Sequence, residues 1–313
     1  MALAQVPVTL FTVVMGLCGF VLALRAGESA LGLAHTGSAA AHVVTMMVFA
    51  AVALAYLAKG LRHPGAVAEE WRNPVSLAFF PAISIAMLLM SVVMLGPAPR
   101  VAHGLFLLAL PVQLILTLAV VSGWIGHRPF AQAHITPAWF IPAVGNVIVA
   151  LAGVPLGHVE IAWFFTSAGL IFWIVLLTLV MNRLIFHDPL PARLQPTLVI
   201  LIAPPAVGYL SWVTLTGEVD AFARVLLNVA YLFVLVVAVQ VPRLAMLPFS
   251  LSFWALSFPL AAVTVASLSH AAATGVAGFR VIGLMLLAVL VLVIAGLLWR
   301  TARGLLRGDL FGA

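Results

Sequence analysis

Long stretches without a charged residue recur along this chain of 313 residues. A helix of about 20 apolar residues crosses the hydrocarbon core of a bilayer, which is about 30 Å thick. Ten uncharged stretches reach at least 18 residues, and each predicts a membrane-spanning helix. They cover residues 1–24, 29–58, 73–99, 101–127, 129–159, 161–182, 194–217, 225–242, 244–279 and 281–299.

A proline stands near the start of every second stretch. These prolines are separated by 67, 63, 59 and 52 residues, and each interval holds one helix out and one helix back. The pattern predicts ten transmembrane helices arranged as five helical hairpins. The prolines that mark it are Pro7, Pro74, Pro137, Pro196 and Pro248.

Further prolines lie deeper in the same alternate helices, whereas among the other helices only Pro111 is clearly interior. Proline removes a backbone N–H and clashes with the preceding turn, so the freed carbonyls must face protein or water rather than lipid. The pattern favours five inner kinked helices around a central pore, surrounded by five outer helices. The alternative is that the prolines only bend helices for packing. The deeper prolines are Pro81, Pro142, Pro204, Pro205 and Pro259.

The composition indicates an all-α integral membrane protein: 65% of residues are hydrophobic, 7% are charged, and the mean hydropathy is +1.26. The first stretch has no basic segment and no small-residue cleavage site before its apolar core, so we interpret it as the first helix rather than a removable signal. The charged connections near residues 59–72 and 183–195 are short. We therefore expect a single transmembrane channel domain over residues 1–313.

Lysine and arginine are distributed unequally between the two sides that ten helices would define. One side carries ten of them and the other only Arg25, Arg100, Arg224 and Arg280. The positive-inside rule then places both termini in the cytoplasm of a multi-pass protein. This distribution accounts for most of the net charge of +6. No basic run with interleaved aromatic residues is present, so we expect no nucleic-acid partner.

Metal, disulfide and enzymatic chemistry find little support. Cys18 is the single cysteine, and no two of the nine histidines have the i, i+4 spacing of a helical metal site. No nucleophile elbow, zinc-protease motif, phosphate loop or dinucleotide fingerprint occurs. We therefore expect neither a cofactor nor a metal, and we expect a protein that is not an enzyme.

The central parts of the proline-bearing helices carry no Lys, Arg, Asp or Glu. A pore without fixed charge discriminates weakly among anions, although helix N-termini still favour anions over cations. Ser84, Thr264 and Ser267 are either direct anion contacts or hydroxyls bonded within their own helices. Gln113 and Asn146 are the amides expected within the membrane, where interhelical hydrogen bonds are the preferred interpretation.

Four segments together resemble one family across essentially the whole chain. They are Thr136-Pro137-Ala138-Trp139-Phe140-Ile141-Pro142-Ala143-Val144, Ala203-Pro204-Pro205, Gly217-Glu218-Val219-Asp220 and Trp254-Ala255-Leu256-Ser257-Phe258-Pro259. Their order is similar to that in the tellurite-resistance/dicarboxylate transporter family, which includes bacterial tellurite-resistance proteins and plant guard-cell slow anion channels.

The resemblance implies a homotrimer of ten-helix protomers, each with an anion pore that a phenylalanine from the ninth helix occludes. By motif position this gate is Phe258, and Phe11 matches a second aromatic residue beside it. The first helix departs from the family pattern, because Val14, with Gly16 nearby, stands where a proline is expected. The expected pore-lining residues are Phe11, Gly16, Pro81, Pro142, Pro204, Pro205, Pro259 and Thr264.

These observations predict an anion channel of the bacterial inner membrane that passes chloride, nitrate and oxyanions such as tellurite. The alternative is a secondary carrier of C4-dicarboxylates such as malate, for which a midplane Arg or Lys is expected and not seen. A membrane scaffold or sensor is a third interpretation. Small inorganic anions or dicarboxylates and membrane lipid are the expected partners.

Overall fold

The computed structural model describes residues 3–126 and 130–307. In that part of the chain the regular structure is entirely helical, with eleven α-helices and seven 3₁₀-helices. The α-helices are α1 (Phe11–Leu31), α2 (Thr36–Arg62), α3 (Pro64–Arg72), α4 (Ala82–Met94), α5 (Pro99–Ile125), α6 (Phe140–Gly153), α7 (Val159–Phe186), α8 (Ala203–Thr216), α9 (Ala221–Ala245), α10 (Ser257–Thr274) and α11 (Ala277–Arg307). The 3₁₀-helices are η1 (Leu3–Gln5), η2 (Val8–Leu10), η3 (Ser76–Phe79), η4 (Gln132–His134), η5 (Pro137–Trp139), η6 (Ala192–Ile202) and η7 (Leu251–Leu256).

Burial alternates along the chain between two kinds of span. Among the described residues, nine helices are long and apolar enough to cross a membrane, and the apolar helix Pro137–Gly153 is shorter. In four of the nine, 61% to 83% of the residues in the most apolar 18-residue stretch are buried; in the other five, only 17% to 33% are. The buried spans are Val8–Leu31, Ser76–Met94, Ala192–Thr216 and Leu251–Thr274, and Pro137–Gly153 is buried along almost its whole length.

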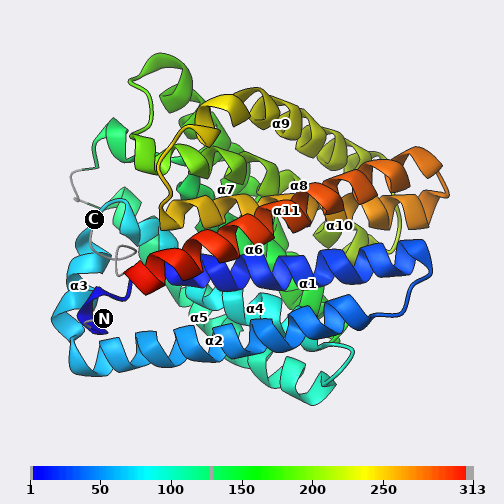
Figure 1. Ribbon diagram of the computed structural model, residues 1–313, viewed down its shortest axis with the longest axis horizontal. Helices are drawn as coiled ribbons and strands as arrows, with labels where there is room; N and C mark the ends of the chain where they lie inside the picture. The colour runs from blue at the N-terminus through cyan, green and yellow to red at the C-terminus, as the bar shows by residue number, and fades with distance from the viewer. Residues whose placement is uncertain (1–2, 127–129, 308–313) are drawn as a thin grey trace.

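The buried spans form a closed ring. Helix α1 packs against α4, α4 against α6, α6 against α8, α8 against α10, and α10 returns against α1. The exposed helices α2, α5, α7, α9 and α11 each pack on the ring helix that precedes them. The start of α1 and the end of α11 lie at the same end of the molecule (Figure 1). We call this end the near side and the opposite end the far side.

Each ring span consists of two parts with different helix types. A 3₁₀ segment on the near side, η2, η3, η5, η6 or η7, leads into the α-helix that completes the span. The prolines expected to kink these helices stand at the junctions: Pro81 is the N-cap of α4, and the others are the second or third residues of α6, α8 and α10. An α-helix needs no N–H donor in its first turn, so proline fits there without breaking a bond.

The first ring span has the same design without a proline at the junction. Helix η2 runs into α1 at Phe11, and Pro7 is the N-cap of η2. The first span therefore still changes from 3₁₀-helix to α-helix at Phe11, although Val14 stands where the family pattern has a proline. A proline at the junction is therefore not required for the change of helix type.

Candidate functional site

The ring encloses two cavities, one on each side of its middle. The near cavity has a volume of about 140 Å³ and is bordered by η2, η3, η6, η7 and the beginnings of α1, α6, α8 and α10. The far cavity has a volume of about 340 Å³ and is bordered by the α-helical parts of all five ring spans. A wider vestibule of about 610 Å³ lies outside the near cavity and shares five lining residues with it. The shared residues are Thr9, Ser76, Leu194, Leu251 and Ser252.

Phe258 borders both the near and the far cavity. It is the second residue of α10, directly before Pro259, and its side chain is 7% exposed. Gly19 of α1 lies beside it: a Cβ atom added there would come within 3.3 Å of the Phe258 ring and 2.8 Å of the Ala261 Cβ atom. Close approach of α1 and α10 thus holds the phenylalanine between the two cavities.

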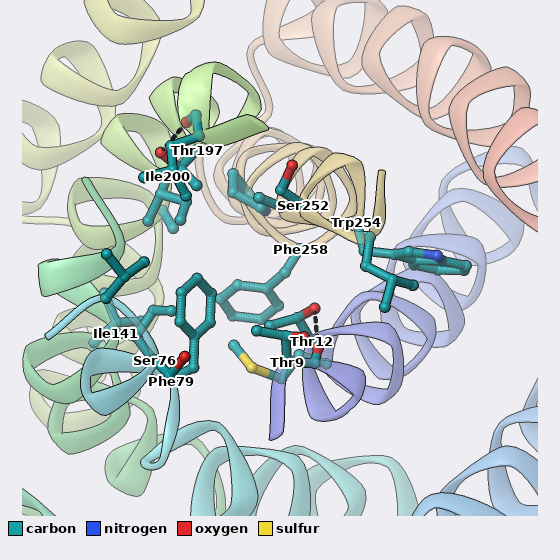
Figure 2. A pocket seen from close by; sticks show the side chains of 18 residues that line it. Thr9, Thr12, Ser76, Phe79, Ile141, Thr197, Ile200, Ser252, Trp254 and Phe258 are labelled. Atoms are coloured by element: carbon teal, nitrogen blue, oxygen red, sulfur yellow. Dashed lines mark hydrogen bonds between the residues drawn. The ribbon is translucent and has the colours of Figure 1, made fainter. Parts of the chain in front are cut away.

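A second aromatic ring, that of Phe79, points into the near cavity and lies next to the ring of Phe258 (Figure 2). Phe79 ends η3, two residues before Pro81. Sequence reasoning missed it, although a signal exists in the sequence. Both Phe79 and Phe258 precede a junction proline within two positions; Phe80 and Phe140 do so as well, so this spacing narrows the 19 phenylalanines of the chain to four.

Three hydroxyl groups of the near cavity donate to backbone carbonyls, two within their own turn and one in a neighbouring segment. Thr12 donates to the Thr9 carbonyl over 2.6 Å, Thr197 to the Leu194 carbonyl over 2.5 Å, and Ser252 to the Arg193 carbonyl over 2.5 Å. A hydroxyl that donates to a carbonyl offers only acceptor lone pairs to a ligand. Side-chain donors therefore contribute little to anion binding at these three positions.

The near cavity still has a positive bias. All five ring spans begin on this side, so the positive ends of their helix dipoles surround it. None of the described residues that line it carries a charge. In the far cavity the one charged lining residue within the described chain is Arg25, which is half-buried, with Nη2 3.4 Å from the Val93 carbonyl.

A buried ion pair anchors the wall of the vestibule. Lys59, 3% exposed, donates to Glu70 over 2.7 Å and to the Val6 carbonyl over 2.8 Å. The Glu70 carboxylate also accepts the Val8 backbone N–H over 2.6 Å and the Tyr56 hydroxyl over 3.0 Å. Glu70 lies in α3 and ties α2 and α3 to the start of the first ring span. Of the vestibule's charged lining residues, Arg193 is therefore the one with no ion-pair partner among the described residues.

The other residues expected to line a pore are buried and border neither cavity. Among the described residues that line the near and far cavities, only Phe258 and Pro259 come from the expected set. The Phe11 ring packs edge-on against Tyr56, 5.6 Å between centroids, and Gly16 lies against Ser257. The prolines Pro81, Pro142, Pro204 and Pro205 are buried at their junctions.

Polar groups buried in the ring bond to protein. Thr264 donates to the Leu260 carbonyl over 2.7 Å, and Ser267 to the Val263 carbonyl over 2.6 Å. Gln113 of α5 accepts from Ser84 over 2.7 Å and donates to Asn146 over 3.4 Å. The preferred interpretation, that Gln113 and Asn146 each make an interhelical hydrogen bond, is confirmed.

Metal-binding side chains do not converge in this arrangement. Over the described part of the chain, no group of three or more His, Cys, Asp or Glu side chains is placed to hold a metal ion. Cys18 is fully buried.

The fold and site together define a multi-pass membrane protein whose ring of helices encloses two cavities with an aromatic side chain between them. The chain belongs to the SLAC1 family, described as voltage-dependent anion channel, whose family model matches residues 5–302. This confirms the resemblance drawn from the four segments.

Individual relatives include channels and a tellurite-resistance homologue. The S-type anion channel SLAH3 of Arabidopsis thaliana is 28% identical over 223 residues, which are 69% of this chain and 34% of the relative. The guard cell S-type anion channel SLAC1 of the same plant is 24% identical, over 70% of this chain and 40% of the relative. The tellurite resistance protein TehA homolog of Haemophilus influenzae is 26% identical, over 82% of this chain and 79% of the relative. The chain matches only about a third to a half of the length of the first plant relatives.

Proposed function

We propose that this protein is an anion channel whose conduction path runs from the vestibule through the near cavity, past Phe258, to the far cavity. The observation that carries the proposal is that one phenylalanine borders both cavities. An apolar ring in a narrow constriction excludes water and so blocks ions until it moves. The family, which is one of anion channels and transporters, supports the same conclusion.

Small anions such as chloride, nitrate and oxyanions such as tellurite are the proposed permeant species. Selection for anions arises from the helix dipoles around the near cavity and from Arg193 and Arg25 at the two ends of the path. Because no charged group lies in the near cavity among the described lining residues, bound anions are held weakly and leave readily.

The proposed assembly is a homotrimer in the bacterial inner membrane, with each protomer containing its own path. The alternation of buried and exposed spans supports ten membrane crossings arranged as five hairpins, with the shorter helix Pro137–Gly153 as the fifth crossing. Both termini would then lie in the cytoplasm, in accord with the distribution of Lys and Arg. The outer helices would face lipid and neighbouring protomers.

A secondary carrier of C4-dicarboxylates is the alternative. Arg25 is the observation in its favour, because a cation bordering the far cavity can pair with one carboxylate. A second cation for the other carboxylate is not found among the described residues that line either cavity. The channel is therefore the better supported function.

The test is voltage-clamp recording of wild type, Phe258→Leu and Phe258→Ala with chloride, nitrate and malate gradients imposed in turn. Removing the ring should raise the current strongly, shortening it to leucine should raise it less, and the currents should reverse near the anion equilibrium potential. Phe106→Leu is the matched control, because Phe106 is fully buried but packs against His158 away from both cavities.

Two outcomes would contradict the proposed gate or the proposed channel. If both Phe258 variants reach the membrane and pass no more current than wild type, the gate assignment is wrong. Saturable malate uptake by wild type in liposomes without current would establish the carrier instead.

A further inference from the structure

A groove of about 660 Å³ opens on the outer surface of the bundle between α7 and α9. Its floor is η6, the long 3₁₀ segment of the fourth ring span. Three residues of α7 spaced by about one helical turn, Leu177, Met181 and Leu184, form one wall, and a single face of α9 forms the other. The groove is distinct from the conduction path, which lies on the opposite side of η6.

Helix η6 presents different residues to the groove and to the path. A 3₁₀-helix has three residues per turn, so residues three apart share a face. Positions 194, 197 and 200 line the near cavity, and positions 195, 198 and 201 line the groove. One helix therefore separates the two spaces. The three residues on the path are Leu194, Thr197 and Ile200, and those in the groove are Gln195, Leu198 and Leu201.

The groove is amphipathic along its length. Its polar residues His187, Gln195, Gln240 and Arg243 come from the near-side ends of the surrounding helices, and the rest of its lining is hydrophobic apart from Pro189. No acidic residue is among the described residues that line it. One exposed cation above a long apolar trough matches an anionic head group above an acyl chain.

We propose that the groove binds an anionic phospholipid, with the phosphate near Arg243 and an acyl chain along Leu198 and Leu201. The near side is also the side that the positive-inside rule assigns to the cytoplasm, so the head group belongs to the cytoplasmic leaflet. A second copy of the chain is the other possible occupant. The lipid is favoured because the groove is polar only at its near-side end, where a head group would lie.

The bound acyl chain supports the wall of the near cavity from behind. Helix η6 is eleven residues long, whereas 3₁₀-helices rarely exceed three or four. A segment of this kind depends on tertiary contacts on both faces, and the lipid supplies those on the outer face. This consequence for conduction rests on the proposed channel function, whereas lipid binding itself does not.

Native mass spectrometry of the purified protein with phosphatidylglycerol or phosphatidylcholine tests the site directly. Wild type should retain phosphatidylglycerol preferentially, Arg243→Gln should lose that preference by about fivefold, and Leu198→Trp should retain less of either lipid because the indole fills the groove. Two matched controls should behave as wild type: Arg224→Gln at the far end of α9, and Leu235→Trp on its exposed face.

Two results would overturn the proposal. One is that wild type and Arg243→Gln show the same ratio of retained phosphatidylglycerol to phosphatidylcholine. Arg243 is exposed, so this variant should fold normally even if Leu198→Trp does not. The other is efficient photo-cross-linking to a second protomer from a benzophenone attached at Val236→Cys, which would show that a second copy covers the groove; Cys18 is fully buried and leaves the label at one position. Because no current is recorded, neither result depends on whether the protein is a channel.

Discussion

The near and far halves of the ring are built from the same five spans, but the two halves of each span differ in helix type. On the near side each span begins as a 3₁₀-helix, and the small cavity there is lined by neutral side chains. On the far side the spans are α-helical, the cavity is larger, and Arg25 borders it. The two halves meet at Phe258.

The difference in helix type changes the thickness of the spans and the residues that share a face. A 3₁₀-helix rises about 2.0 Å per residue and an α-helix about 1.5 Å, so the near segments are thinner and present residues three apart on one face. The far ends close with tight α-helical caps, in which Gly217 and Gly275 adopt left-handed conformations at φ 76° and 72°. The near half encloses the smaller cavity, about 140 Å³, and the far half the larger one, about 340 Å³.

The largest expected effect is a difference in anion current between variants of the two aromatic residues, Phe258 and Phe79. Phe258 borders both cavities, whereas Phe79 borders only the near one. Phe258→Ala should therefore raise anion current severalfold more than Phe79→Ala, because only the first substitution connects the cavities. Voltage-clamp currents normalised to surface expression measure this. Equal currents would mean that the constriction lies in the near cavity rather than at its boundary.

The buried ion pair on the near side should contribute strongly to stability. Lys59→Met leaves the Glu70 carboxylate buried without its cation, which should reduce the free energy of unfolding by about 3 kcal/mol. The double variant Lys59→Met/Glu70→Leu should recover part of that loss. Thermal unfolding in detergent provides the measurement. A double variant that loses as much as the two single variants together would contradict this account.

The contact between α1 and α10 can be tested at the boundary itself. Gly19→Ala should cost about 1–3 kcal/mol and displace Phe258, because the added methyl group meets Ala261 and the Phe258 ring. Gly278→Ala is the control: a Cβ atom there meets open space, so no loss is expected. Unfolding midpoints and basal current should both change in Gly19→Ala. An unchanged Gly19→Ala protein would show that α1 and α10 separate easily.

The charge on the far side should act on conduction rather than on stability. Arg25→Gln removes the one charged residue among the described lining of the far cavity and should lower the current carried by anions that enter from that side, roughly twofold at low salt and less at high salt. Currents in the Phe258→Ala background at two ionic strengths measure the effect. Arg280→Gln, at the far-side start of α11, is the control, and an equal loss there would indicate a general surface effect.

The smallest effect concerns Asp220, the N-cap of α9 on the far side. The Ala223 N–H and the Trp212 indole N–H hold the pKa of this carboxyl below its ordinary value. A lowered pKa means that the ionised group stabilises the fold above the ordinary pKa and loses that effect as pH falls through the lowered value. Asp220→Ala should lower the unfolding midpoint near pH 7, and the difference from wild type should shrink below about pH 4. A pH-independent difference would exclude this mechanism, and Glu218→Ala in the same turn provides the comparison.

The sequence predicted most of the spans because hydrophobic length is a local property. It also predicted where the helices change, since a proline marks four of the five junctions, but it assigned kinks where the structure has a change of helix type. Phe79 and Glu70 were missed for a different reason. Their roles depend on neighbours that are remote in the chain: Phe79 meets Phe258, and Glu70 accepts from Val8 and Lys59.

By itself the sequence determined the membrane class, the family and the alternation of two kinds of helix, because apolar length, proline spacing and motif order are written along the chain. Only the tertiary structure decided which side chains border the cavities. Residues such as Gly16 and Thr264 lie in ring spans yet face neighbouring helices or their own backbone. The side of a helix that faces a lumen depends on how five spans pack around it, and no single span carries that information.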